Sequence, residues 1–265
     1  MNIFALEQPF NAISHLVYSI FNHSEKHKKM KRFQFFTILL SAILMMSSCN
    51  KADDQATGVG DVLVVAKQSG PTTVYGISLY AYTLSSFSSV SAVSSADPGK
   101  AYTLKSNRGY KTSFFYETPE TEFTSTKPVV ATYNFSAVFE NGVAQNFQNI
   151  LSDKILPIPN VVKCEYSTTN HQLETTWADL TDANSYSISM FEGSTLVFGS
   201  TELKKTVLSY SVKATDTGGG WAVGFTPVSG KTYTVRVYAY LYEPNGGAYN
   251  VQAISIAEKT VVWGN

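Results

Sequence analysis

The sequence is poor in the residues that carry most catalytic and metal chemistry. It has 2 cysteines, Cys49 and Cys164, and 4 histidines in 265 residues. The histidines are His15, His23, His27 and His171. A nucleophile usually needs histidine as its base, and a zinc site needs three or four ligands. We therefore expect no enzymatic activity, no catalytic residues, no metal site and no cofactor.

Charge is also scarce. Charged residues make up 15% of the chain, against about 25% in an average soluble domain. The formal net charge is zero, and several basic residues cluster at positions 26–32, so the remainder is mildly acidic. Because nucleic-acid binding needs a basic face, we expect no nucleic-acid partner. The abundance of tyrosine and phenylalanine, 16 of each, favours strands over helices.

No apolar run reaches the ~20 residues of a transmembrane helix. The longest covers residues 33–46 and follows the basic start Met30-Lys31-Arg32. A basic start before a short apolar run is typical of a secretory signal, which we predict over residues 30–48. We interpret residues 1–29 as an extension from a start codon assigned too early, and an extended n-region is the alternative.

The segment Met46-Ser47-Ser48-Cys49 resembles the lipobox of bacterial lipoproteins. The resemblance implies that the signal is removed before Cys49 and that Cys49 is acylated, which would attach the chain to a membrane. Methionine stands at position 46, where the family usually has leucine. Stable anchoring takes two or more acyl chains, and this modification supplies them. The alternative is an ordinary signal peptide cut nearby, with Cys49 left as a free thiol.

Residues 49–60 are polar and contain two glycines, so we predict a flexible tether behind the lipidated cysteine. Within it, Lys51, Asp53 and Asp54 resemble the export signal of Bacteroidetes-type surface lipoproteins. The resemblance implies an outer-membrane location with the protein exposed on the cell surface. A plain polar linker, with the protein facing the periplasm, is the alternative.

Residues 61–157 alternate short strand-like runs with turn signals such as Asn141-Gly142. One run places apolar side chains at every second position: Tyr133, Phe135, Ala137 and Phe139. This period of two predicts a strand with one buried face. Residues 61–157 resemble an immunoglobulin-type sandwich. The serine-rich residues 85–95 are predicted to form a further strand that leads into a turn at Asp97-Pro98-Gly99.

The prolines at positions 157 and 159 predict a domain boundary, because proline cannot continue a central strand. Residues 158–265 then resemble a fibronectin type III domain, on a strand that ends in Trp177 and on the run 230–243 with Tyr233 at a tyrosine corner. The resemblance implies a seven-stranded sandwich without enzymatic activity. It also implies that Trp177 and Tyr233 are core residues.

Four aromatic residues are candidates for ligand binding: Trp221, Tyr238, Tyr240 and Tyr242. The three tyrosines fall on the face opposite Tyr233, and Trp221 follows three glycines in a predicted loop. Exposed rings can stack on sugars or form an interface hot spot. The alternative is cross-strand packing of these rings on a solvent-facing sheet.

The densest acidic group is Glu117, Glu120 and Glu122, which we expect to be solvated in a loop. A pocket joining two of them would instead indicate an enzyme, since glycoside hydrolysis uses paired carboxylates. Once Cys49 is lipidated, Cys164 has no partner within the chain. We predict a buried thiol there, with an intermolecular disulfide as the alternative. We expect His171 in a surface turn.

The sequence thus predicts an all-β protein of two tandem sandwiches, immunoglobulin-like and then fibronectin type III-like, attached to the membrane through lipid on Cys49. We expect a non-catalytic binding or adhesion module with a glycan or an outer-membrane protein as partner. The alternative is a structural spacer or a subunit of a surface fibre or outer-membrane assembly.

Overall fold

The structure is a computed structural model, and it describes residues 57–216, 220–244 and 250–264. Within these ranges the chain is almost entirely β-structure, with one short 3-10 helix, η1 (Glu120–Glu122). No helix in the described ranges has the length and apolar character needed to cross a membrane. The predicted all-β fold is confirmed.

The first sandwich is built from seven strands. They are β1 (Gly58–Ser69), β2 (Thr72–Thr83), β3 (Phe87–Ser94), β4 (Asp97–Asn107), β5 (Tyr110–Glu117), β6 (Ala131–Phe139) and β7 (Ala144–Leu151). The order β1-β2-β5-β4 forms one layer and β3-β6-β7 the other, and pairing of β3 with β4 joins them. This is the strand order of a constant-type immunoglobulin domain.

The core of this sandwich follows the predicted period of two. Along β6, buried and exposed residues alternate, with Phe135 and Phe139 among the most buried side chains. Residues 85–95 do form a strand, β3. The turn after it lies at Ser95–Ala96 rather than at Asp97-Pro98-Gly99, because a bulge at Val93/Ser94 brings Asp97 opposite Ser94.

The second sandwich has a three-stranded and a four-stranded layer. Its strands are β8 (Val161–Ser167), β9 (Gln172–Trp177), β10 (Ser185–Glu192), β11 (Thr195–Gly199), β12 (Leu203–Lys204), β13 (Ser209–Lys213), β14 (Thr232–Tyr242) and β15 (Val251–Val262). The layers are β13-β9-β8 and β11-β10-β14-β15, and the two-residue β12 pairs with β10. Seven strands in this order form the predicted fibronectin type III-like sandwich.

The two residues that carried this resemblance are core residues. Trp177 and Tyr233 are buried. The backbone N–H of Val228 donates a hydrogen bond to the Tyr233 hydroxyl over 2.9 Å. A tyrosine hydroxyl bound to backbone a few residues upstream is the tyrosine corner that the sequence predicted.

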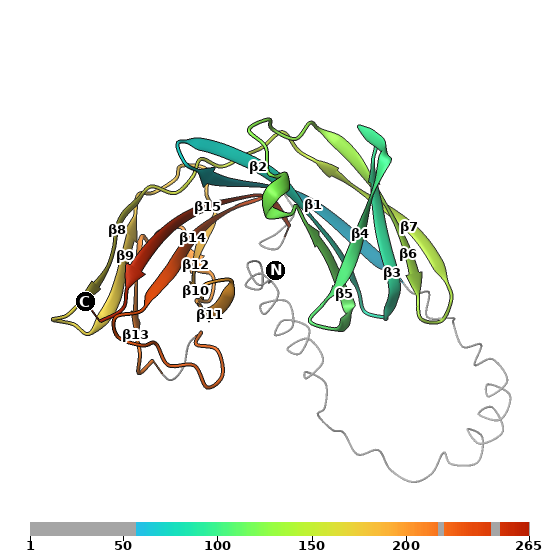
Figure 1. Cartoon of the computed structure of the whole chain (residues 1–265). Helices are drawn as coiled ribbons and strands as arrows, with labels where there is room; N and C mark the ends of the chain where they lie inside the picture. Colours follow the sequence, from blue (N-terminus) through green and yellow to red (C-terminus); the bar gives the residue numbers. More distant parts are fainter. Residues whose placement is uncertain (1–56, 217–219, 245–249, 265) are drawn as a thin grey trace, which may run out of the picture.

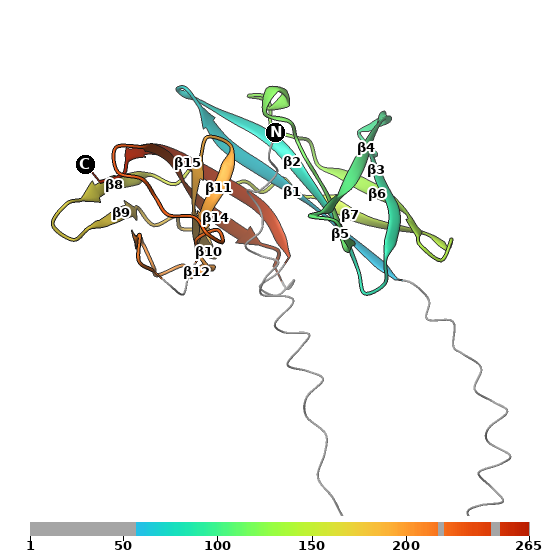
Figure 2. The ribbon, with the colours of Figure 1, turned by 60° about the horizontal axis from the view of Figure 1, so that its bottom comes forward.

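The two sandwiches share one sheet. Residues 64–67 of β1 pair in parallel with residues 253–256 of β15, so the first strand of one sandwich extends the layer of the other. In Figure 1 the two sandwiches descend on either side of β1, β2 and β15, so that the shared sheet arches between them. Figure 2 shows the same central strands from another side. No sequence pattern indicated this pairing.

One predicted segment needs correction. The tether was expected to reach residue 60, but β1 already begins at Gly58. Both glycines in this stretch lie against aromatic rings: a Cβ at Gly58 would be 2.7 Å from the Phe147 ring, and one at Gly60 would be 2.7 Å from Phe135. Glycine here allows close packing of a strand rather than flexibility.

Candidate functional site

The predicted aromatic binding residues do not form an exposed surface. Tyr238 and Tyr240 are 0% and 3% exposed, so the expectation that they face solvent is wrong. Their rings are stacked, with centroids 6.4 Å apart, and the Tyr240 hydroxyl shares a 2.7 Å hydrogen bond with that of Ser187. Tyr242 is half-buried, and its hydroxyl lies 2.6 Å from that of Ser185.

These tyrosines are buried because the arch brings together the outer faces of both sandwiches. Leu63 and Val65 of β1 and Tyr80 of β2 form one apolar cluster with Tyr238, Tyr240, Val251 and Ile254. We call this set the inter-sandwich cluster. A face that would be solvated in a single sandwich is therefore a third hydrophobic core.

Trp221 lies outside a regular strand, as predicted, but it is half-buried rather than free. Its ring packs against Phe198, Phe225 and Trp263, with centroids 5.0 to 5.8 Å away. Its indole N–H donates to the carbonyl of Lys213 over 3.0 Å. Trp221 thus covers one end of the second core.

The lipidation site Cys49 and the export-signal residues Lys51, Asp53 and Asp54 lie outside the described residues. Cys164 lies in β8, where it is half-buried, and burial raises the pKa of its thiol. His171 is exposed in the turn between β8 and β9, as predicted. Among the described residues no group of three or more His, Cys, Asp or Glu side chains could hold a metal ion.

One hollow lies beside the inter-sandwich cluster, between the two sandwiches. This interdomain cleft has a volume of about 640 Å³. It is lined by β1, β2, β4, β5 and the loop after β5 from the first sandwich, and by β10, the turn after β10, β14 and β15 from the second. Aromatic rings from both sandwiches form part of its wall, namely Phe115, Tyr116, Phe123 and Phe191. Its position depends on the β1–β15 pairing.

Two ion pairs, one from each sandwich, line this cleft. Lys67 pairs with Glu120, and its ammonium group lies 3.7 Å from the centre of the Phe123 ring. Arg236 donates to Glu258 over 2.8 Å, and its guanidinium lies 4.5 Å from the centre of the Phe191 ring. Each cation is therefore held by a carboxylate and an aromatic face.

Glu117 differs from these acids. Its carboxylate makes no ion pair or hydrogen bond with the described residues, and Glu117 is half-buried at the end of β5, whereas a solvated loop position was predicted. Burial raises the pKa of its carboxyl from 4.5 to about 7, although the nearby Arg236 opposes the shift. Near neutral pH this group can thus donate or accept a hydrogen bond in the cleft.

Replacing Glu117 with glutamine should make stability less dependent on pH. The raised pKa means that the folded state binds the proton more tightly, so the free energy of unfolding falls as pH rises from about 4.5 to about 7. We expect Glu117→Gln to be more stable than the wild type by about 1–2 kcal/mol at pH 8, and nearly equal at pH 5. Asp61, whose pKa is also raised to about 7 by burial and by Glu243, should retain part of the pH dependence.

Urea unfolding at both pH values measures this effect. An equal gain in stability at pH 5 and pH 8 would show that ionisation of Glu117 is not its cause.

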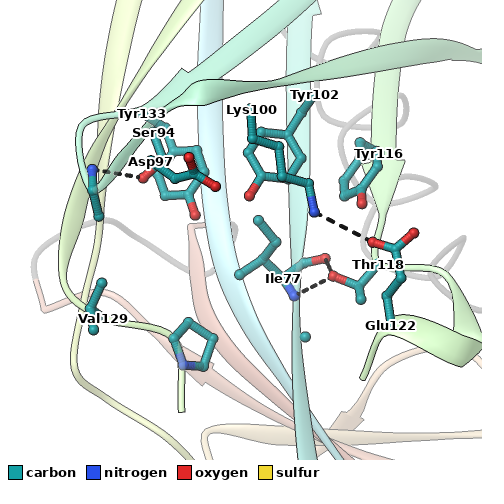
Figure 3. Close-up of a pocket in the computed structure, with 13 residues that line it drawn as sticks. Ile77, Ser94, Asp97, Lys100, Tyr102, Tyr116, Thr118, Glu122, Val129 and Tyr133 are labelled. Carbon is teal, nitrogen blue, oxygen red and sulfur yellow. Dashed lines mark hydrogen bonds and ion pairs between the residues drawn. The ribbon is translucent and has the colours of Figure 1, made fainter. Parts of the chain in front are cut away.

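A second hollow of about 270 Å³ opens at one end of the first core, and Figure 3 shows its lining. We call it the tyrosine pocket, after Tyr102, Tyr116 and Tyr133. Tyr116 and Thr118 line both hollows, so the loop that follows β5 separates the pocket from the cleft. Glu120 faces Lys67 in the cleft, while Glu122 faces Lys100 in the pocket at 3.4 Å.

Sequence reasoning found the acidic loop but not the two hollows. The pattern of Glu117, Glu120 and Glu122 was visible, whereas the strands that supply Arg236 and Lys67 are far apart in sequence. Tyr102 and Tyr133 could have been singled out as aromatic positions on predicted strands. Nothing local distinguished them from ordinary core residues.

No protein-family model matches the chain, and no curated protein matches it. Partly similar solved structures include a DUF3823 family protein from Bacteroides uniformis, a 1.5-MDa bacterial ice-binding adhesin and the FN1-FN3 domains of chicken CNTN1. Their identities are 11%, 12% and 12%, and their TM-scores are 0.28, 0.26 and 0.24. The alignments cover 77%, 78% and 70% of this chain, and 99%, 64% and 62% of those chains. This chain thus spans less than two thirds of the latter two, and TM-scores this low carry no argument about function.

Proposed function

We propose that this protein is a lipid-anchored component of the cell envelope that binds a glycan in the interdomain cleft without catalysing a reaction. The cleft carries the proposal: it combines aromatic walls, hydrogen-bonding side chains and two ion pairs. Ligand sites commonly have this mixture, and they often lie between domains. Neutral polyhydroxylated chains suit it, because they need stacking surfaces and hydrogen bonds rather than free charges.

Enzymatic activity is the competing hypothesis, because Glu117 and Glu120 both line the cleft. Glycoside hydrolysis needs one protonated acid and one free carboxylate. Glu117 could serve as the acid, but Glu120 and Glu258 are each held by a cation. This pairing favours binding over hydrolysis.

A pair of tryptophan substitutions tests the cleft. Thr103 lines it from an exposed position on β4, so Thr103→Trp should fill it and weaken glycan binding at least tenfold on a glycan array followed by calorimetry. Ala101→Trp is the matched control, two residues earlier on the same exposed face and outside the cleft. Equal binding by both variants would refute the cleft as the site. Sugar release by the wild type that is lost in Glu117→Gln would instead show an enzyme.

The anchor is a separate part of the proposal. Acylated Cys49 would hold the protein in the outer membrane, and Lys51, Asp53 and Asp54 would direct it to the cell surface. Cys49→Ala should move the protein out of the membrane fraction, since the acyl chains supply the membrane affinity. Mature Cys49→Ala protein that still sediments with membranes would contradict the anchor.

A structural spacer is the second candidate. The observation that favours it is the parallel pairing of β1 with β15, which joins the two sandwiches through backbone hydrogen bonds rather than a linker alone. Such a joint would suit a rigid element in a surface assembly.

A further inference from the structure

The tyrosine pocket is pre-formed by its own contacts. Tyr102 of β4 lies at the centre, with its ring centroid 5.1 Å from that of Tyr116 and 5.9 Å from that of Tyr133. The Ser94 hydroxyl, which also lines the pocket, accepts a hydrogen bond from the backbone N–H of Ala96 over 3.2 Å. Three strands thus hold the rings in place, so a ligand would not have to order them.

The loop that closes the pocket is also fixed. The Thr118 hydroxyl accepts from the backbone N–H of Ile77 over 2.8 Å and donates to its carbonyl over 3.0 Å. Tyr75 and Thr124 exchange two backbone hydrogen bonds. Gly76 allows this fit, because a Cβ there would be 2.8 Å from the Thr118 side chain and 2.9 Å from Phe123.

The polar groups of the pocket point to an uncharged ligand. Figure 3 shows the Lys100–Glu122 pair on the side of Tyr116, and Asp97 on the side of Tyr133. One ammonium group and two carboxylates disfavour an anion, and these charges also disfavour a purely apolar molecule. Hydroxyl groups remain well matched, since tyrosine and serine hydroxyls can both donate and accept.

Two further properties narrow the ligand. Burial raises the pKa of Tyr102, Tyr116 and Tyr133, that of Tyr133 to about 12. Their hydroxyls are protonated at neutral pH, as those of ordinary tyrosines are. The volume of about 270 Å³ lies just below the ~300–1,000 Å³ of pockets for drug-sized ligands. There is room within it for one six-membered ring with its substituents.

We propose that the tyrosine pocket is a second binding site, separate from the interdomain cleft, that takes a single neutral sugar residue. The ring of the half-buried Tyr116 would contact the apolar face of the sugar ring, and Asp97, Lys100 and the hydroxyls of the buried Tyr102 and Tyr133 would bond to its hydroxyl groups. This site does not depend on ligand binding in the cleft, because the two hollows lie on opposite sides of the loop after β5.

Two neighbouring valines provide a matched test in the full chain. Val129 lines the pocket, whereas Val130 does not, and both are well exposed, at 64% and 58%. A panel of neutral hexoses, with glucosamine and glucuronate as charged comparisons, would be screened by saturation-transfer NMR and titrated. We expect saturable millimolar binding of at least one neutral hexose, as suits so small a ligand. Val129→Trp should weaken this binding at least tenfold, and Val130→Trp less than twofold.

The cleft variant Thr103→Trp separates this site from the cleft and should bind the hexose normally. Unchanged binding by Val129→Trp would overturn the proposal, as would the absence of neutral hexose binding at ligand concentrations of about 50 mM, well above a millimolar Kd. Binding of glucosamine alone, abolished by salt, would show a cation site instead. Loss of hexose binding in Thr103→Trp but not in Val129→Trp would assign the sugar to the cleft.

Discussion

Replacing Tyr240 with alanine is expected to destabilise the protein by about 3–5 kcal/mol, the range for truncating a large buried aromatic side chain. Tyr240 is 3% exposed in the inter-sandwich cluster, stacks on Tyr238 and hydrogen-bonds to Ser187. Its removal leaves a cavity and strips the buried Ser187 hydroxyl of its partner, which adds to the cost. Urea unfolding followed by tyrosine and tryptophan fluorescence measures the change.

Tyr110→Ala is the matched control. Tyr110 is 65% exposed at the start of β5, so its truncation should change stability by less than about 0.5 kcal/mol. If Tyr240→Ala were as mild as Tyr110→Ala, the third core between the sandwiches would not exist in solution, and Tyr240 would again be a candidate for an exposed binding surface.

Cutting the chain between the sandwiches should leave them associated. A protease site inserted between Asp153 and Lys154, in the connection between β7 and β8, would break the chain and leave the residues of β1 and β15 unchanged. The cleaved halves should co-elute as one particle, because the parallel ladder and the inter-sandwich cluster still join them. Separating the cleaved halves in denaturant should require a free energy of more than about 3 kcal/mol, because several large apolar side chains would become exposed to water together.

Gel filtration before and after cleavage measures whether the two halves stay associated, and Val65→Asp is the comparison variant. Val65 is 5% exposed, lies in the cluster and pairs with Ile254 of β15. A charge buried there should release the halves after cleavage. Cleaved wild-type halves that elute separately, each with unchanged stability, would show two independent domains on a linker.

The candidate site was only partly foreseeable from sequence, and the reason is distance along the chain. Glu117 was noticed as part of an acidic loop, but the cleft that it lines is completed by Arg236 and Ile256, which the other sandwich contributes. Tyr238 and Tyr240 were correctly placed on the face opposite Tyr233. Whether that face meets water depends on β1, which lies about 170 residues earlier, and no local pattern records such a contact.

The sequence by itself determined the all-β class, the strand positions and the core residues Trp177 and Tyr233, because side-chain alternation and turn residues act over a few positions. It also predicted lipidation and membrane attachment at Cys49, which lies outside the described residues. Only the tertiary structure decided that β1 joins β15, that the tyrosine face becomes a core and that two hollows flank the loop after β5. These features arise from pairing between strands that are distant in sequence. The free N–H and C=O groups of an edge strand can form hydrogen bonds with any strand that the fold places beside it.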